Sequence, residues 1–271
     1  QINWNDKAAN MRAIAKELNL GLDSFVFLDD DKTNREMIKS LLPDVSVIEL
    51  PDDPADYVTT LQRVNDFNTL HLTDEDRERG ALYARERERE ALKQTTGTLE
   101  DFLKTLKIKV RIADADQLTL PRIAQLTQKT NQFNVTTRRY AQEQIETMLR
   151  SKKVLVKYVR AQDRFGDYGI TGAAIIKRES AQWIIDTFLL SCRILGKNIE
   201  AALMTKLLTD AKKAGVAEVV GEFIPTAKNA PAETFYKTYG FAAAKKTAAG
   251  SRWSFNLKKK IPAYPKHVKV I

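Results

Sequence analysis

The chain has 271 residues, of which 43% are hydrophobic and 29% are charged, and this balance is typical of a globular protein with two domains. Its single cysteine excludes an internal disulfide and a cysteine-based zinc cluster, which fits a reducing, cytoplasmic location. No apolar stretch approaches the roughly 20 residues that a membrane span needs, so we expect no membrane association.

The net charge of +9 is unevenly distributed. Residues 1–105 hold 14 Lys/Arg against 22 Asp/Glu, a net charge of −8, whereas residues 106–271 hold 30 against 13, a net charge of +17. The basic residues are scattered and not interleaved with aromatic residues, and no nucleic-acid-binding motif is present. We therefore expect a polyphosphate cofactor or an acidic protein partner rather than nucleic acid.

The first 105 residues alternate between helical and strand patterns. Helical spacing predicts a helix over 7–18, and the apolar run Phe25–Leu28 predicts a strand of a covered parallel sheet. Asp29, Asp30 and Asp31 follow that strand at its carboxyl end, where open α/β sheets place their ligands. Further predicted elements are a helix over 34–42, a strand over 45–50, a charged helix over 73–93 with its N-cap at Thr73, and a helix over 99–106.

From residue 106 onward the pattern is that of a second α/β domain. Alternating apolar and polar residues predict a strand over 108–112. The remaining predicted elements are helices over 120–130 and 141–150, strands over 153–160, 168–177 and 181–190, a helix after Gly196, a strand over 216–224, a helix over 232–239 and a closing pair of strands over 241–257.

One turn in this domain has a strong chemical signature. The predicted strand ending at Leu190 runs into Ser191–Asn198, in which Arg193-x-x-Gly196 opens a helix. Free backbone N–H groups and the positive end of the helix dipole suit a pyrophosphate there. Further along the chain come Asn229 and the block Phe235–Phe241, which reads Phe-Tyr-Lys-Thr-Tyr-Gly-Phe.

This order of strand, turn, helix, strand, Asn and aromatic block resembles the GCN5-related N-acetyltransferase (GNAT) family. The resemblance implies a mixed α/β sheet that binds coenzyme A or the phosphopantetheine arm of a carrier protein. For Asn229 the alternative is a helix N-cap, and for Cys192 a small residue packed in the turn, since no histidine lies near it for a nucleophilic pair. The cofactor-binding residues implied are Leu189, Leu190, Cys192, Arg193, Leu195, Gly196, Lys197, Asn198 and Asn229.

Acyl transfer needs a proton donor for the leaving thiolate, and the resemblance places Tyr236 in that role. Its alternative is a packed aromatic residue with a satisfied hydroxyl. Asp186 and Glu222, on neighbouring strands, are candidate general bases or members of structural ion pairs. A dense polar set between the first two helices, namely Asn131, Gln132, Asn134, Thr136 and Arg138, is predicted to recognise the acceptor substrate or to form a structural loop network.

The first 60 residues resemble the C-terminal half of a haloacid dehalogenase (HAD) fold. The resemblance implies that Lys7 steadies a phosphate and that Asp29 and Asp30 hold Mg²⁺, a hard cation that prefers oxygen ligands. The Asp-x-Asp-x-Thr nucleophile motif is not found among these residues, and Asp114-Ala-Asp116 lacks its threonine. We expect that motif upstream of residue 1, as in a fragment of a longer chain.

Together these features resemble the FkbH-like family, on three segments: Asn3-Trp-Asn, Phe25–Arg35 and Thr130–Tyr140. The expected organisation is a partial HAD-like (Rossmannoid) α/β segment over 1–70, a helical linker over 71–105 and a GNAT-like acyltransferase domain over 106–271. The resemblance implies transfer of an acyl group, such as a glyceryl unit, using coenzyme A or a carrier-protein phosphopantetheine thioester, in polyketide, nonribosomal peptide or surface polysaccharide biosynthesis. The best-known members of the family load a glyceryl unit from a phosphorylated glycerate onto an acyl carrier protein. The alternative is a non-catalytic GNAT-like domain that docks a carrier protein for the HAD half.

Overall fold

The computed structural model describes residues 1–18, 20–67, 79–247 and 250–271. The chain divides into two compact units, residues 1–87 and 88–271, and helix α5 (Arg79–Thr95) runs across the division. The predicted N-cap at Thr73 lies outside the described residues. Within the described ranges, none of the helices combines the length and the apolar character that crossing a membrane requires. The predicted boundaries at residues 70 and 105 stay predictions.

The first unit is a small α/β segment. Helices α1 (Lys7–Leu18) and α2 (Lys32–Leu41) confirm the two predicted helices, and the predicted strands form a parallel pair of two residues each, β1 (Val26–Phe27) and β2 (Ser46–Val47). Asp31 caps α2, because its carboxylate accepts the backbone N–H of Thr33 at 2.7 Å. The unit also contains α3 (Tyr57–Gln62), which the sequence did not predict, and short 3₁₀ turns over Leu22–Ser24, Pro54–Asp56 and Asn65–Phe67. Its HAD-like assignment stays a prediction.

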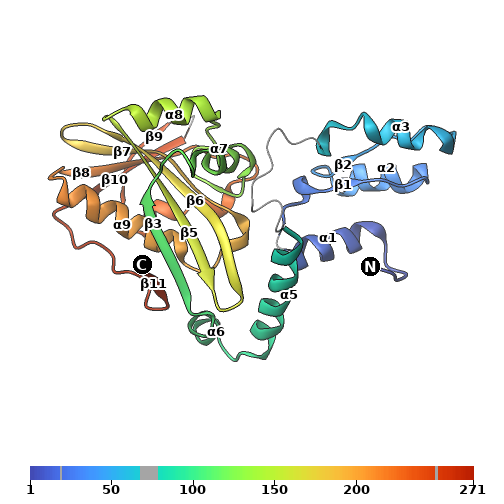
Figure 1. Ribbon diagram of the computed structural model, residues 1–271, viewed down its shortest axis with the longest axis horizontal. Coiled ribbons are helices and arrows are strands. Elements are labelled where there is room, and N and C mark those ends of the chain that lie inside the picture. The colour runs from blue at the N-terminus through green and yellow to red at the C-terminus, as the bar shows by residue number, and fades with distance from the viewer. Residues whose placement is uncertain (19, 68–78, 248–249) are drawn as a thin grey trace. The chain divides into compact units, whose positions relative to one another are not determined.

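The second unit is built on one mixed sheet in the order β11-β3-β5-β6-β7-β8-β10-β9 (Figure 1). Neighbouring strands are antiparallel from β3 to β7 and from β8 to β9, while β7 runs parallel to β8 and β11 runs parallel to β3. This order and mixture of directions confirm the GNAT-type mixed α/β sheet. The strands are β3 (Ile108–Asp114), β5 (Val154–Asp163), β6 (Gly166–Arg178), β7 (Gln182–Leu190), β8 (Glu218–Phe223), β9 (Ala242–Thr247), β10 (Gly250–Asn256) and β11 (Val268–Val270).

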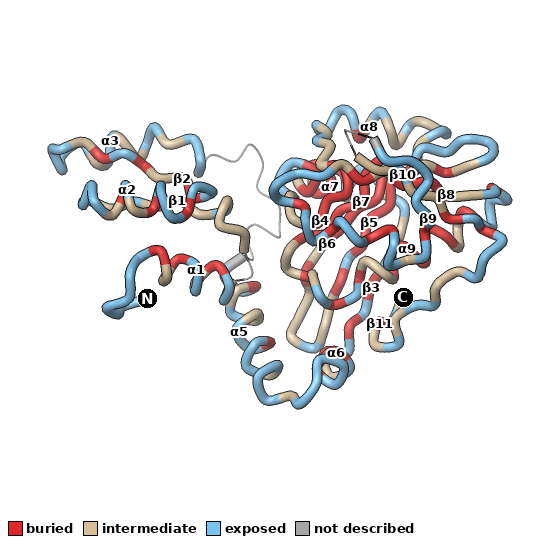
Figure 2. The backbone as a smooth tube through the Cα atoms, turned by 180° about the vertical axis from the view of Figure 1, so that it is seen from behind, coloured by how far each residue is buried: buried red, intermediate tan, exposed pale blue. Residues whose placement is uncertain are grey.

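Helices cover both faces of this sheet. Helices α6 (Leu99–Leu106), α9 (Ile199–Lys213) and α10 (Phe235–Thr238) share one apolar core with the sheet. Helices α7 (Leu120–Lys129) and α8 (Gln142–Arg150) build a second core on the opposite face. Figure 2 shows the buried stretches gathered in the central strands between these layers.

Two strands of the second unit were not predicted. Strand β11 extends the sheet beyond β3, and β4 (Phe133–Asn134) pairs with the end of β7. The polar stretch over 130–140 was expected to be a loop, but Phe133, Asn134 and Val135 are all buried. Their polar groups are satisfied inside the sheet, which is what makes the burial of an asparagine there possible.

Candidate functional site

Strands β7 and β8 pair over only part of their length. The parallel register runs from Gln182 opposite Glu218 to Ile185 opposite Gly221, and then stops. Asp186 follows directly, and the register between β6 and β7 shifts there, so that Asp186 stands at a β-bulge. We call this point, where the two strands separate, the fork.

The space beyond the fork is filled by residues 133–136, which we call the inserted segment. Phe133 lies opposite Leu190 and Asn134 opposite Leu189 in an antiparallel register with β7. The N–H of Val135 donates to the carbonyl of Phe188 at 3.1 Å. On the other side, the N–H of Ile224 donates to the carbonyl of Val135 at 2.8 Å, so the inserted segment bridges the two separated strands.

A charged cluster surrounds Asp186 at the fork. Its carboxylate, only 1% exposed, accepts hydrogen bonds from Lys177 at 2.7 Å, Tyr140 at 2.5 Å and Arg138 at 3.1 Å. Burial alone would raise the pKa of Asp186, but the bonds from Lys177 and Tyr140 and the charge of Arg138 outweigh it and hold that pKa below its ordinary value. Asp186 is therefore a weak proton acceptor.

Arg138 joins the two candidate bases. Its guanidinium contacts the backbone carbonyl and the carboxylate of Asp186 and also binds Glu222 at 2.5 Å. Although burial opposes the charged form, the carboxylates of Asp186 and Glu222 raise the pKa of Arg138, so this cation is permanent. The ion pairs foreseen as the alternative for both acids are present, and the general-base role stays a prediction.

Tyr236 reaches the fork from α10. Its side chain is fully buried and packs on Gly221, where an added Cβ would lie 2.2 Å from the ring. The hydroxyl is a buried oxygen with no well-aligned hydrogen bond among the described residues, although the backbone N–H of Glu222 is close enough to lower its pKa in part. Burial is the larger effect and raises that pKa, and the charges of Glu222, Arg138 and Asp186 also act on it. A buried, protonated and unpartnered hydroxyl is costly unless something else binds it.

The predicted phosphate turn has the expected backbone shape. Gly196 (φ 75°) and Asn198 (φ 58°) are both left-handed, and a Cβ on Gly196 would have open space around it. The N–H groups of Leu195 and Lys197 already bond to Cys192 and Ile194, which leaves those of Gly196 and Asn198 as the donors that suit a phosphate. The Lys197 side chain donates to the carbonyl of Arg193 at 3.0 Å, and its role in cofactor binding stays a prediction.

Two other predicted cofactor residues are used internally. Asn229 is fully buried, and its amide donates to the carbonyls of Asn134 and Ile224 at 2.9 Å each, while its oxygen accepts the N–H of Thr226 at 2.7 Å. It thus ties the inserted segment to the end of β8. Burial raises the pKa of the Cys192 thiol, which disfavours a nucleophilic thiolate.

Most of the predicted acceptor-binding residues belong to the same internal network. Thr136 donates to the carbonyl of Asp186 at 2.9 Å, Asn134 accepts the N–H of Thr137 at 2.9 Å, and Asn131 accepts from Arg139. Gln132 is half-buried, and Arg138 lies at the fork. The structural loop network, the alternative reading for this set, is therefore present, and a role in acceptor recognition stays a prediction.

In the first unit, Lys7 and Asp29 form an ion pair. Asp29 also accepts the side-chain amide of Asn34 at 3.1 Å and the backbone N–H of Asp31 at 3.0 Å. Burial would raise the pKa of Asp29, but the bond from Lys7 and these two bonds outweigh it and lower that pKa. Asp30 is exposed. Three-residue acidic, histidine or cysteine clusters able to hold a metal are not found in the described part of the chain, so Asp29 and Asp30 would need further ligands for Mg²⁺.

Sequence reasoning missed two members of the charged cluster. Tyr140 stands in the motif Thr130–Tyr140 but gave no separate signal, and burial together with its bond to Asp186 raises its pKa. Lys177 lies on β6 next to the bulge, a position that only the strand register reveals.

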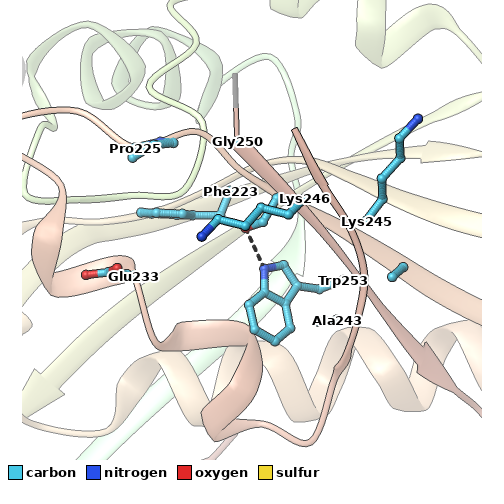
Figure 3. A pocket seen from close by; sticks show the side chains of 10 residues that line it. Phe223, Pro225, Glu233, Ala243, Lys245, Lys246, Gly250 and Trp253 are labelled. Atoms are coloured by element: carbon cyan, nitrogen blue, oxygen red, sulfur yellow. Dashed lines mark hydrogen bonds between the residues drawn. The ribbon is translucent and has the colours of Figure 1, made fainter. Parts of the chain in front are cut away.

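A separate cavity of about 640 Å³ opens beside the end of β8, and Figure 3 shows it from close by. Trp253 and Phe223 line it from two adjacent strands, with Glu233 on one side and Lys246 on another. The Trp253 indole donates to Ser251 at 2.9 Å. None of the predicted site residues lines this cavity.

No protein-family profile matches the chain, and no curated protein matches it either. Among solved structures, the ribosomal-protein-S18-alanine N-acetyltransferase of Escherichia coli is similar over 55% of this chain and 94% of its own, at 17% identity and a TM-score of 0.43. The N-acetylglutamate synthase of Neisseria gonorrhoeae, solved with coenzyme A and N-acetyl-glutamate, is similar over 55% of this chain and 35% of its own, at 14% identity and a TM-score of 0.42.

A third similarity is shorter but higher in identity. The N-terminal part of a Bacteroides fragilis protein, which contains a phosphatase domain complexed with Mg, is 47% identical over 26% of this chain and 19% of its own, with a TM-score of 0.25. The fold of the second unit rests on the strand order and register described above.

Proposed function

We propose that the second unit transfers an acyl group held as a phosphopantetheine thioester, on coenzyme A or on an acyl carrier protein. The observation that carries this proposal is the hydroxyl of Tyr236, buried and unpartnered at the fork beside a fixed guanidinium. In this reaction an acceptor nucleophile attacks the thioester carbonyl, the carbon–sulfur bond breaks and a thiolate leaves. The hydroxyl is placed to donate a hydrogen bond to that thiolate.

The raised pKa of Tyr236 shapes this role. A thiol has a pKa of about 8.5, well below that of a buried phenol, so the hydroxyl stabilises the thiolate by a hydrogen bond better than by giving up its proton. Arg138 supplies a permanent positive charge for the oxyanion of the tetrahedral intermediate. A thiol acceptor needs little base catalysis, which suits a fork whose two acids are already paired.

The finer assignment is a FkbH-like protein that loads a glyceryl or similar acyl unit onto a carrier protein. Two observations support it: the motif Thr130–Tyr140 supplies both Arg138 and Tyr140 to the fork, and residues 106–271 carry a charge of +17, which favours an acidic carrier protein. The ion pair of Lys7 with Asp29 supports the HAD-like expectation, with Mg²⁺ held there in a complete domain.

The second candidate function is carrier-protein docking without catalysis. It is favoured by the filled fork and by the pairing of Asp186 and Glu222 with Arg138. Incubation of the full chain with acetyl-CoA and a holo carrier protein, followed by intact mass measurement of the carrier, separates the two. Acylation of the carrier above the uncatalysed level, lost in Tyr236→Phe, supports transfer, whereas binding of the carrier without acylation supports docking.

A further inference from the structure

The inserted segment occupies the direct path between the phosphate turn and Tyr236. The turn starts where β7 ends, at Leu190, and the fork lies four residues back along that strand, at Asp186. A thioester arm that is anchored at the turn and reaches the fork must follow the edge of β7 from Leu190 to Phe188. That edge is where Phe133 and Val135 are bonded.

The chemistry of the arm matches that of the segment. Phosphopantetheine is an extended chain with two amide groups, and such a chain binds a free strand edge through backbone hydrogen bonds. The inserted segment makes bonds of this kind to Phe188 on one side and Ile224 on the other. One edge cannot serve both partners at once.

The segment is also anchored by its side chains. Val135 and Asn134 are fully buried, and the ring of Phe133 packs edge-on against Phe235 at 5.3 Å and near Phe188 at 6.4 Å. Asn229, which the family resemblance assigns to the arm, instead donates to the carbonyl of Asn134. The residues expected to hold the arm are thus bonded to the chain itself.

We propose that residues 133–136 are an exchangeable internal strand that competes with the thioester arm, so that the arm binds only when the segment leaves the fork. This inference rests on the proposed function of the second unit. The apparent affinity for the arm is then the intrinsic affinity multiplied by the fraction of molecules with the segment released. Burial of two large apolar side chains sets that fraction on the order of 1 in 10² to 1 in 10⁴.

Competition with the inserted segment should affect free coenzyme A and a carrier-bound arm differently. Free coenzyme A has only its own contacts to offset the release of the segment. A carrier protein adds a docking surface to the same arm, and the basic second unit attracts an acidic carrier. The carrier-bound arm is therefore expected to bind more tightly than free coenzyme A.

The test uses a loosened and a locked form of the full chain, with acetyl-CoA and an acetylated carrier protein, whose arms have no free thiol, as probes in calorimetry. Val135→Ala loosens the segment, and Val110→Ala, equally buried but in β3, is the matched control. In the locked form, Asn134→Cys and Leu189→Cys place two cysteines directly opposite each other in the register, so that a disulfide between them holds the segment in the fork. Cys192→Ser removes the native thiol from this form. The reduced form of the locked protein is its own control.

Competition predicts that Val135→Ala binds about tenfold more tightly than the parent, that Val110→Ala does not, and that oxidation of the locked protein abolishes binding that reduction restores. Hydrogen exchange at Val135 and Ile224 should also speed up when the ligand is added. Equal binding by all forms would overturn the competition and leave the proposed function standing. Absence of binding in every form, the loosened one included, would overturn both.

Discussion

Substitution of Tyr236 should affect the free energy of unfolding and the acyl-transfer rate in opposite ways. Its hydroxyl is buried without a partner, so removing it should leave the free energy of unfolding unchanged or slightly higher. The same change should lower the acyl-transfer rate by about 10²- to 10³-fold, because the leaving thiolate loses a hydrogen-bond donor. Thermal melts and initial rates of Tyr236→Phe measure both effects. A less stable variant with full activity would show that the residue is a packing aromatic.

Glu200, at the start of α9, provides a prediction about pH. Burial raises the pKa of its carboxyl above 4.5, and its Oε2 has no hydrogen-bond partner among the described residues. A raised folded pKa stabilises the fold below the unfolded pKa and loses that contribution as pH rises through the folded value. Glu200→Gln should therefore be more stable than the parent at pH 8, by about 1 kcal/mol, with a smaller difference at pH 4. Melts across this range test it, and a pH-independent difference would contradict it.

Among the secondary-structure elements, the sequence predicts most strands of the sheet but neither strand β4 nor the charged cluster at the fork. The alternation of apolar and polar residues was sufficient to predict the long strands of the sheet. The Arg193-x-x-Gly196 turn lies between β7 and α9, as expected. Strand β4 escaped prediction because it is two residues long and sits in a polar stretch, whose asparagine and threonine side chains bind backbone groups instead of solvent. The cluster at Asp186 needed the register of β6 against β7, which no local pattern contains.

Gly221 of β8 packs closely against the ring of Tyr236 in α10. Gly221→Ala would place a methyl group 2.2 Å from the Tyr236 ring, so the ring must move. We expect a loss of about 1–3 kcal/mol in stability and a fall in transfer rate with it. Gly80→Ala, where nothing lies within 4 Å, is the control and should be neutral or stabilising. Similar melting temperatures for the two variants would mean that Tyr236 does not pack on β8 as described.

At the scale of the whole molecule, α5 belongs in part to the second unit. Arg89 is 1% exposed, forms bonds of 2.7 and 2.9 Å to Asp163 and lies 4.2 Å from the ring of Tyr168. A fragment over 79–271 should therefore fold cooperatively. A fragment over 106–271, cut at the predicted junction, removes Arg89, the cation paired with the Asp163 carboxylate, and leaves that carboxylate only its bonds from Tyr168 and the backbone, so it should lose about 3–5 kcal/mol. Urea unfolding of the two fragments compares them, and equal stability would place the boundary at the later position.

Ligand binding at the phosphate turn is the most direct test of the proposed acyl-transfer site. Gly196 has φ 75° with open space beside it, so Gly196→Val strains the backbone and puts a side chain where a pyrophosphate would approach. The measurement is calorimetric titration of the folded full chain with a holo carrier protein and with acetyl-CoA, comparing the parent, Gly196→Val and Arg193→Ala. Loss of two charge-assisted hydrogen bonds predicts at least about a hundredfold weaker binding for Gly196→Val and a smaller loss for Arg193→Ala. Unchanged affinity in a folded Gly196→Val protein would contradict the assignment of this turn, and with it an acyl-transfer site at the fork.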